Sequence, residues 1–144
     1  MTGVSEVAGS SYAITVTVYR SFGDTLAATR EALAAQGFGV LTEIDMQATL
    51  KAKLGVDVMP QVILGACRPP LAHAALQVEP SIGLLLPCNV VVRELDGDRT
   101  RVETIDPNIM VSVTGNPDLQ AVATEARTRL TVALNSLHPA PPTC

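Results

Sequence analysis

The chain has 144 residues, of which 47% are hydrophobic and only 3% aromatic, so one domain of ordinary size can form a core of Leu, Val, Ile, Ala and Met. Ten Lys and Arg residues against fourteen Asp and Glu give a net charge of −4. That charge argues against a nucleic-acid partner, because phosphate binding needs a basic face. No segment approaches the ~18 apolar residues of a membrane span, and the N-terminal residues do not resemble a signal peptide. We therefore expect a cytoplasmic protein with no membrane partner.

Residues 1–10 are small and polar, and we expect them to be disordered. A single domain is expected over residues 11–137, followed by a Pro-rich tail over residues 138–144. The three cysteines are an odd number, and one of them lies in that tail, which argues against a disulfide scaffold.

The first third of the domain predicts a strand, a helix and a second strand. Hydrophobic and polar residues alternate over residues 12–19, which is typical of a half-buried strand. Ser21 is the expected N-cap of a helix that Gly37 ends, and residues 38–44 form the next strand. The residues expected to face the core are Ile14, Val16 and Val18, then Phe22, Leu26, Ala27, Leu33 and Ala34, then Phe38, Val40 and Ile44.

Asp45 is the expected N-cap of a short helix, and Gly55 is its expected C-terminal glycine. Met46, Leu50 and Leu54 recur every four residues and predict the apolar face of this helix. A third strand is expected over residues 60–66. Pro69 and Pro70 favour a helix start directly after it, and Pro80 ends that helix.

Residues 83–95 predict one long apolar strand, in which Pro87 indicates an edge position or a bulge. Asp96 and Gly97 indicate a tight hairpin leading to an alternating strand over residues 99–105. Asp106-Pro107 indicates a turn, and residues 109–113 remain ambiguous. Asn116 begins the last amphipathic helix. Its expected buried stripe is Leu119, Val122, Ala123, Ala126, Leu130, Ala133, Leu134 and Leu137.

This order of elements predicts an α+β domain, a two-layer sandwich with a mixed sheet of about five strands and helices packed on one face. The other face of the sheet would then need a cover. A twofold homodimer supplies one, so we expect a second copy as the partner.

Four segments carry a resemblance to a known family: GFGVLTEIDMQATLKAKLG, ILGACRPPLAHAALQVEPSIGLLLPCNVVVRE, IDPNIM and the C-terminal helix. Together, over about residues 12–137, they resemble the domain of unknown function 302 family. The resemblance implies a small bacterial or archaeal α+β protein, often dimeric, whose activity is not established. The pattern falls on Glu43, Asp45, Lys51, Cys67, Pro69, Pro70, His73, Glu79, Pro80, Gly83, Pro87, Cys88, Asn89, Asp106, Pro107 and Met110. At Arg68 the family more often has Asn.

Chemistry concentrates in the segment Leu64–Asn89. Cys67 follows a predicted strand and precedes a predicted helix, where unpaired N–H groups would stabilise a thiolate. His73 lies about one turn further on. Cys88 would lie beside Ala66, and so near Cys67, if the two flanking strands were parallel neighbours; for other arrangements the sequence leaves their distance open.

Three functions remain open, and whether the protein is an enzyme is undecided. The first is binding of a small ligand near the junction of Cys67, His73 and Cys88. The second is thiol redox chemistry, with Cys67 reactive and Cys88 resolving. The third is soft-metal binding, copper-type, by Cys67, Cys88, His73 or Met110. The ligand-binding candidates are Glu43, Lys51, Cys67, Arg68, His73, Cys88 and Asn89.

Each candidate also has a plainer interpretation. Buried cysteines often only fill space, and Met110 could do the same. Asp45 could be only a cap, and Glu43 and Lys51 could form an exposed ion pair. A purely structural or interaction dimer is therefore the last alternative. No phosphate-binding glycine motif occurs, and the sequence leaves the cofactor unknown.

Overall fold

The computed structural model describes residues 12–137. The disordered N-terminus and the Pro-rich tail expected from the sequence lie outside these residues. None of the described helices is both long and apolar enough to cross a membrane.

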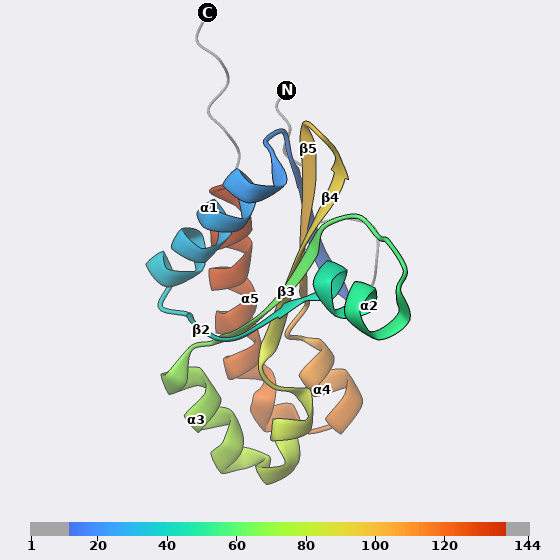
Figure 1. Cartoon of the computed structure of the whole chain (residues 1–144). Coiled ribbons are helices and arrows are strands. Elements are labelled where there is room, and N and C mark those ends of the chain that lie inside the picture. Colours follow the sequence, from blue (N-terminus) through green and yellow to red (C-terminus); the bar gives the residue numbers. More distant parts are fainter. Residues whose placement is uncertain (1–11, 138–144) are drawn as a thin grey trace, which may run out of the picture.

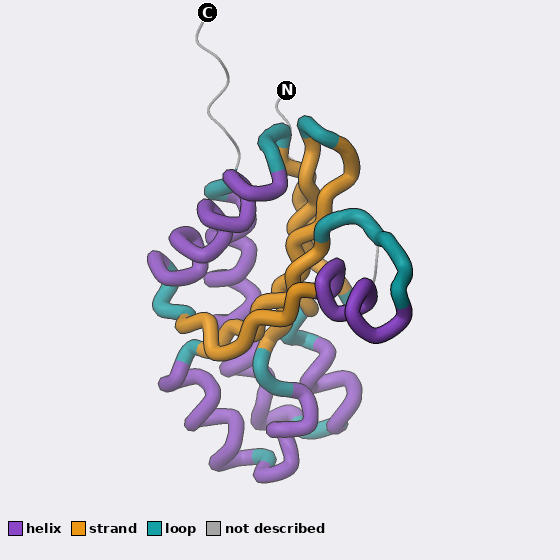
Figure 2. The backbone as a smooth tube through the Cα atoms, in the orientation of Figure 1, coloured by secondary structure: helices purple, strands orange, loops and turns teal. Residues whose placement is uncertain are grey.

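The elements alternate between strands and helices up to β4 and end in helices (Figures 1 and 2). The strands are β1 (Ala13–Val18), β2 (Gly39–Asp45), β3 (Gln61–Cys67), β4 (Cys88–Asp96) and β5 (Arg99–Ile105). The helices are α1 (Phe22–Ala35), α2 (Met46–Leu54), α3 (Pro69–Val78), α4 (Ile109–Thr114) and α5 (Gln120–Asn135). Two 3₁₀ helices, η1 (Pro80–Leu85) and η2 (Pro117–Leu119), precede β4 and α5.

The five strands form one sheet in the order β1-β5-β4-β3-β2, and every neighbouring pair is antiparallel. The sequence predicted a mixed sheet. The difference arises between β3 and β4, which the sequence allowed to be parallel neighbours. In the structure, α3 and η1 return the chain to the end of the sheet that it has just left, so β4 runs back alongside β3.

Two apolar cores hold the domain together. Helices α1 and α5 cover one face of the sheet and enclose the first core, which includes Leu64, Val90 and Leu134. A second, smaller core lies beyond the end of the sheet, among α3, η1, α4 and the start of α5, around Ile82 and Met110. Because α5 contributes to both, it joins the two cores.

Several local signals in the sequence are confirmed. Ser21 Oγ accepts a hydrogen bond from the Asp24 N–H at 3.2 Å, and Asp45 Oδ1 accepts one from the Ala48 N–H at 2.9 Å, so both residues cap their helices. Gly55 ends α2 with a φ of 71°. The hairpin of β4 and β5 turns at Gly97, as expected from its Asp-Gly pair.

Three predictions about burial are wrong. In α1, Ala27 and Ala34 are exposed and the buried face instead carries Thr25 and Thr29. The Thr29 hydroxyl donates to the Thr25 carbonyl at 2.7 Å, which satisfies it inside an apolar layer.

The second error concerns β2, where a bulge at Leu41 reverses the alternation of side chains. Val40 pairs with Ala66 but Thr42 pairs with Gly65, so Ile44 turns to the opposite face from Val40. The third concerns α2, where Met46 and Leu50 are only half-buried and Leu54 is exposed, so none of its nine described residues is fully buried.

The predicted long strand over residues 83–95 begins only at Cys88. Residues 80–85 form η1, and a cis peptide bond joins Leu86 to Pro87. The apolar run that suggested a buried strand is therefore partly a wall of the second core and partly open to solvent; Leu84 is 87% exposed.

Gly65 has no room for a side chain. A Cβ there would lie 2.8 Å from Pro87 Cγ and would overlap the Thr42 hydroxyl. We expect Gly65→Ala to lower the free energy of unfolding by about 1–3 kcal/mol, measured by urea denaturation, because strand pairing has to shift. As a control, Gly23→Ala in α1, where no described atom lies within 4 Å of the added Cβ, should cost nothing. Equal effects of the two substitutions would contradict this account.

Candidate functional site

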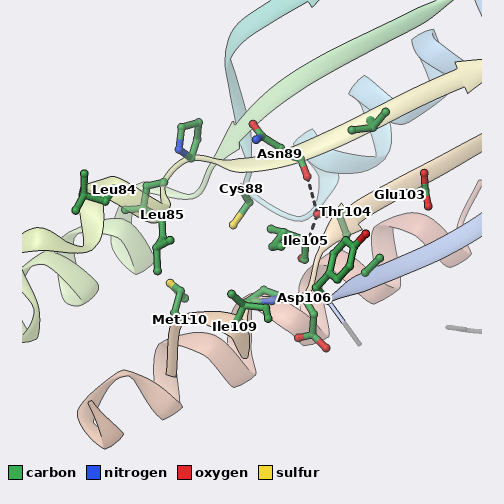
Figure 3. Close-up of a pocket in the computed structure, with 16 residues that line it drawn as sticks. Leu84, Leu85, Cys88, Asn89, Glu103, Thr104, Ile105, Asp106, Ile109 and Met110 are labelled. Atoms are coloured by element: carbon green, nitrogen blue, oxygen red, sulfur yellow. Dashed lines mark hydrogen bonds between the residues drawn. The ribbon is translucent and has the colours of Figure 1, made fainter. Parts of the chain in front are cut away.

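A cavity of about 470 Å³ lies at the end of the sheet where β4 begins and β5 ends (Figure 3). One wall is the segment that leads from η1 into β4, and the other is the segment from β5 into α4. The start of β1 closes one side. The lining residues are Tyr12, Ala13, Leu84, Leu85, Leu86, Pro87, Cys88, Asn89, Val91, Glu103, Thr104, Ile105, Asp106, Pro107, Ile109 and Met110.

Hydrogen bonds hold the two walls in place. The Thr104 hydroxyl of β5 donates to the Asn89 carbonyl of β4 at 3.1 Å, which joins the walls at the sheet. Asp106 Oδ1 accepts from the Asn108 N–H at 3.0 Å and shapes the turn before α4. Asp106 Oδ2 accepts from Arg127 Nε at 3.2 Å, so the same carboxylate anchors the turn to α5.

The cavity is mainly apolar with a few polar groups at its edges, which is the usual composition of a small-molecule site. No Lys, Arg or His is among its described lining residues, whereas Glu103 and Asp106 both are. Each of these carboxylates pairs with an arginine outside the cavity: Glu103 with Arg93 at 3.1 Å and Asp106 with Arg127 at 3.2 Å. The site is therefore neutral to negative in character.

Cys88 forms the inner wall of this cavity, and its sulfur points into it (Figure 3). Burial, together with the negative charge that Cys67 would carry, raises the pKa of the Cys88 thiol from 9.0 to about 11. Cys88 is consequently a neutral thiol at pH 7. This disfavours Cys88 as a resolving nucleophile, because the thiolate is the attacking form.

A second, smaller cavity of about 30 Å³ lies beside the first, among the end of β3, α3, α4 and α5. Leu86, Pro87, Cys88 and Met110 line both cavities and so separate them. The remaining lining residues of the smaller cavity are Phe38, Ala66, Cys67, Arg68, Leu71, Ala72, Ala75, Val122 and Ala126.

Cys67 and Cys88 are neighbours, although for a different reason from the one considered in the sequence. Cys88 pairs with Ala66 across the antiparallel strands β3 and β4, so Cys67 lies one residue beyond that pair. Both thiols are free. Cys67 is still part of β3, and Arg68 is the N-cap residue of α3, so Cys67 does not cap the helix.

The other expected ligand-binding residues lie elsewhere. His73 is exposed on α3 and lines neither cavity. Glu43 and Lys51 do not pair with each other: Glu43 forms an ion pair with Arg30 of α1, and Lys51 contacts Asp57 at 3.0 Å. Of the seven candidates, Cys88 and Asn89 line the larger cavity and Cys67, Arg68 and Cys88 line the smaller one.

Among residues 12–137, no three His, Cys, Asp or Glu side chains are placed to hold one metal ion together. Of the metal candidates, His73 is thus separate, while Cys67, Cys88 and Met110 share the smaller cavity.

Sequence reasoning missed most of the larger cavity, including Tyr12, Glu103 and Ile109. One signal was present. Of the family-pattern positions, six line this cavity, although the sequence indicated only a turn at Asp106-Pro107 and left Met110 as either core or metal ligand. These six are Pro87, Cys88, Asn89, Asp106, Pro107 and Met110.

The profile of a family described as a domain of unknown function, DUF302, matches residues 14–137. The chain belongs to this family. A crystal structure of an uncharacterized conserved DUF302 protein from Bacillus stearothermophilus is similar to this DUF302 chain, with a TM-score of 0.80 and 31% sequence identity. The alignment covers 87% of this chain and 97% of that one. No curated protein matches the chain.

The raised pKa of Cys88 predicts a specific dependence of stability on pH. Above pH 9 the Cys88 thiol loses its proton in the unfolded state but keeps it in the folded state. Raising the pH above 9 therefore favours the unfolded state. The contribution of Cys88 to the free energy of unfolding is fully present below pH 9. It falls by roughly 1.4 kcal/mol per pH unit between pH 9 and about 11. We expect the stability difference between wild type and Cys88→Ala to narrow over that range in urea denaturation.

Val90→Ala is the matched control, because it also truncates a buried β4 residue but removes no titrating group. Its difference from wild type should stay constant with pH. A difference for Cys88→Ala that also stays constant would contradict the raised pKa.

Proposed function

We propose that this DUF302 domain binds a small, mainly apolar molecule in the larger cavity. The observation that carries the proposal is the cavity itself: about 470 Å³ falls within the roughly 300–1,000 Å³ typical of small-molecule sites. Its walls belong to different elements that are fixed by hydrogen bonds, so the cavity is preformed.

The electrostatics of the site favour a neutral or cationic ligand. Glu103 and Asp106 lie at the cavity, and no basic residue is among its described lining residues. An anionic ligand would meet two carboxylates and no basic lining residue, because the arginines that pair with these carboxylates, Arg93 and Arg127, lie outside the lining. The Asn89 side chain is exposed at the rim, where its amide can donate and accept hydrogen bonds.

A neutral fluorescent probe, N-phenyl-1-naphthylamine, tests this proposal. We expect its fluorescence to rise on binding wild-type protein, and Val91→Phe to weaken binding by about tenfold or more because the added ring occupies the cavity. Ile63→Phe is the matched control: Ile63 pairs with Val91 on the same sheet face but does not line the cavity. Equal binding to wild type and Val91→Phe would overturn the proposal.

We further propose that the protein forms a homodimer through β2, α2 and the loop that follows α2. In Figure 1, α2 lies on the side of the sheet opposite α1 and α5. β2 is an edge strand, and Leu41, Leu54 and Met59 around it are 67%, 69% and 50% exposed. Such an apolar patch on an open edge is unusual for a monomer.

A second copy of the chain suits this surface better than an unrelated partner. An edge strand can pair antiparallel with its own copy about a twofold axis, which extends one sheet across both protomers. The surface also carries Lys51 and Asp57, which pair with each other within one chain at 3.0 Å, so these two charges together do not repel a second copy.

Light scattering after gel filtration tests the dimer. Wild-type protein should have the mass of two chains at micromolar concentration, and Leu41→Glu with Leu54→Glu should give monomers, because four carboxylates would meet at the twofold interface. Val113→Glu is the control, since Val113 is 64% exposed on α4, away from the proposed surface. A monomeric wild type, or a dimer that persists in the double variant, would overturn the proposal.

A further inference from the structure

Three sulfur-containing side chains from separate elements line the smaller cavity. Cys67 comes from the end of β3, Cys88 from the start of β4 and Met110 from α4, and all three line the same space. Figure 3 shows the Cys88 and Met110 sulfurs on facing sides of the region between η1 and α4, at the boundary that the two cavities share. No sequence motif joins these three residues. The antiparallel return of β4 places Cys88 near Cys67, and α4, which follows β5, adds Met110.

The size of the cavity restricts what could occupy it. A volume of about 30 Å³ admits one water or one ion and excludes an organic molecule. A single water is a poor occupant, because the lining is mostly apolar side chains and sulfur.

The donor set restricts the occupant further. No carboxylate or imidazole is among the described lining residues, so hard cations and four-coordinate zinc lack their usual ligands. Two thiolates and a thioether are soft donors that select copper(I).

The charge balance is also favourable. Two thiolates and one monovalent cation leave a net charge of −1, which would be costly to bury alone. Arg68 lines the same cavity, and its Nε is buried with no hydrogen-bond partner among the described residues. The Arg68 guanidinium also lies near the carboxylate of Glu125, but this ion pair is weak because Nη1 and Oε2 are 3.9 Å apart. The guanidinium is thus available to neutralise the complex.

We propose that Cys67 and Cys88 bind one copper(I) ion as thiolates, with Met110 as the third ligand and Arg68 as the balancing charge. Each thiol releases its proton to solvent as its sulfur binds, so two thiols and one Cu⁺ give a complex of charge −1 and two protons. No electron is transferred. Cys67 is only partly buried, which gives the ion a path from solvent.

This site is separate from the proposed small-molecule site, although Cys88 and Met110 line both cavities. Binding of the fluorescent probe is measured without copper, so failure of one proposal leaves the other intact.

Competition with the copper(I) chelator bicinchoninate, on reduced protein without oxygen, tests the site. Cys144→Ser is introduced throughout so that Cys67 and Cys88 are the only thiols. We expect one Cu⁺ per chain, with near-ultraviolet thiolate-to-copper absorption. Cys67→Ser and Cys88→Ala should each weaken binding by about 100-fold or more, and Met110→Leu and Arg68→Gln by roughly tenfold.

Met59→Leu is the control for Met110→Leu, because Met59 is exposed and lines neither cavity. It should leave the affinity unchanged. Thermal unfolding of the metal-free variants separates loss of a ligand from loss of the fold, and Cys67→Ser, at the less buried position, keeps the test valid if Cys88→Ala does not fold. A folded Cys67→Ser that retains wild-type affinity, or a wild type that takes up no copper(I), would overturn the proposal.

Discussion

The antiparallel pairing of β3 with β4 brings Cys67 together with residues that separate the two cavities. Because α3 and η1 bring the chain back to the end of the sheet that β3 has left, Cys88 begins β4 directly opposite Ala66. The last residue of one central strand and the first of the next are then neighbours. β5 ends at the same edge and continues into α4. The two cavities therefore form where the end of β3, the start of β4, the end of β5 and α4 meet.

Helix α5 fixes this edge to the rest of the domain. Its Leu130 and Leu134 belong to the core beneath the sheet, while Ala123 belongs to the core beyond it. Its polar face reaches both cavities: Arg127 holds the Asp106 turn, and Glu125 approaches Arg68. One rigid helix therefore sets the spacing between the walls, which favours a preformed site over one that assembles on binding.

Local signals in the sequence predicted the elements well, and long-range geometry limited the rest. Alternation identified β1 and β5, and the caps at Ser21 and Asp45 located α1 and α2, because these depend on nearby residues. The direction of β4 could not be predicted, since a helical connection permits either direction. Residues 83–87 resembled the start of a strand, because hydrophobicity alone does not distinguish a buried strand from an apolar 3₁₀ helix such as η1. More than half of the residues that line the larger cavity come from segments near residues 12 and 103–110, which no spacing rule connects to Cys88.

Thr42 and Pro87 both pack into the space that a side chain on Gly65 would need, so three segments of the chain are in close contact there. Because of this close packing, the residues tolerated at position 65 depend on those at positions 42 and 87. A side chain at position 65 requires a smaller residue at position 42 and a shift of Pro87, so it is harmful when it is acquired before position 42 changes. Relatives of this chain are therefore expected to vary at positions 42 and 65 as a pair, so the close packing between the paired strands β2 and β3 leaves a trace of epistasis in their sequences.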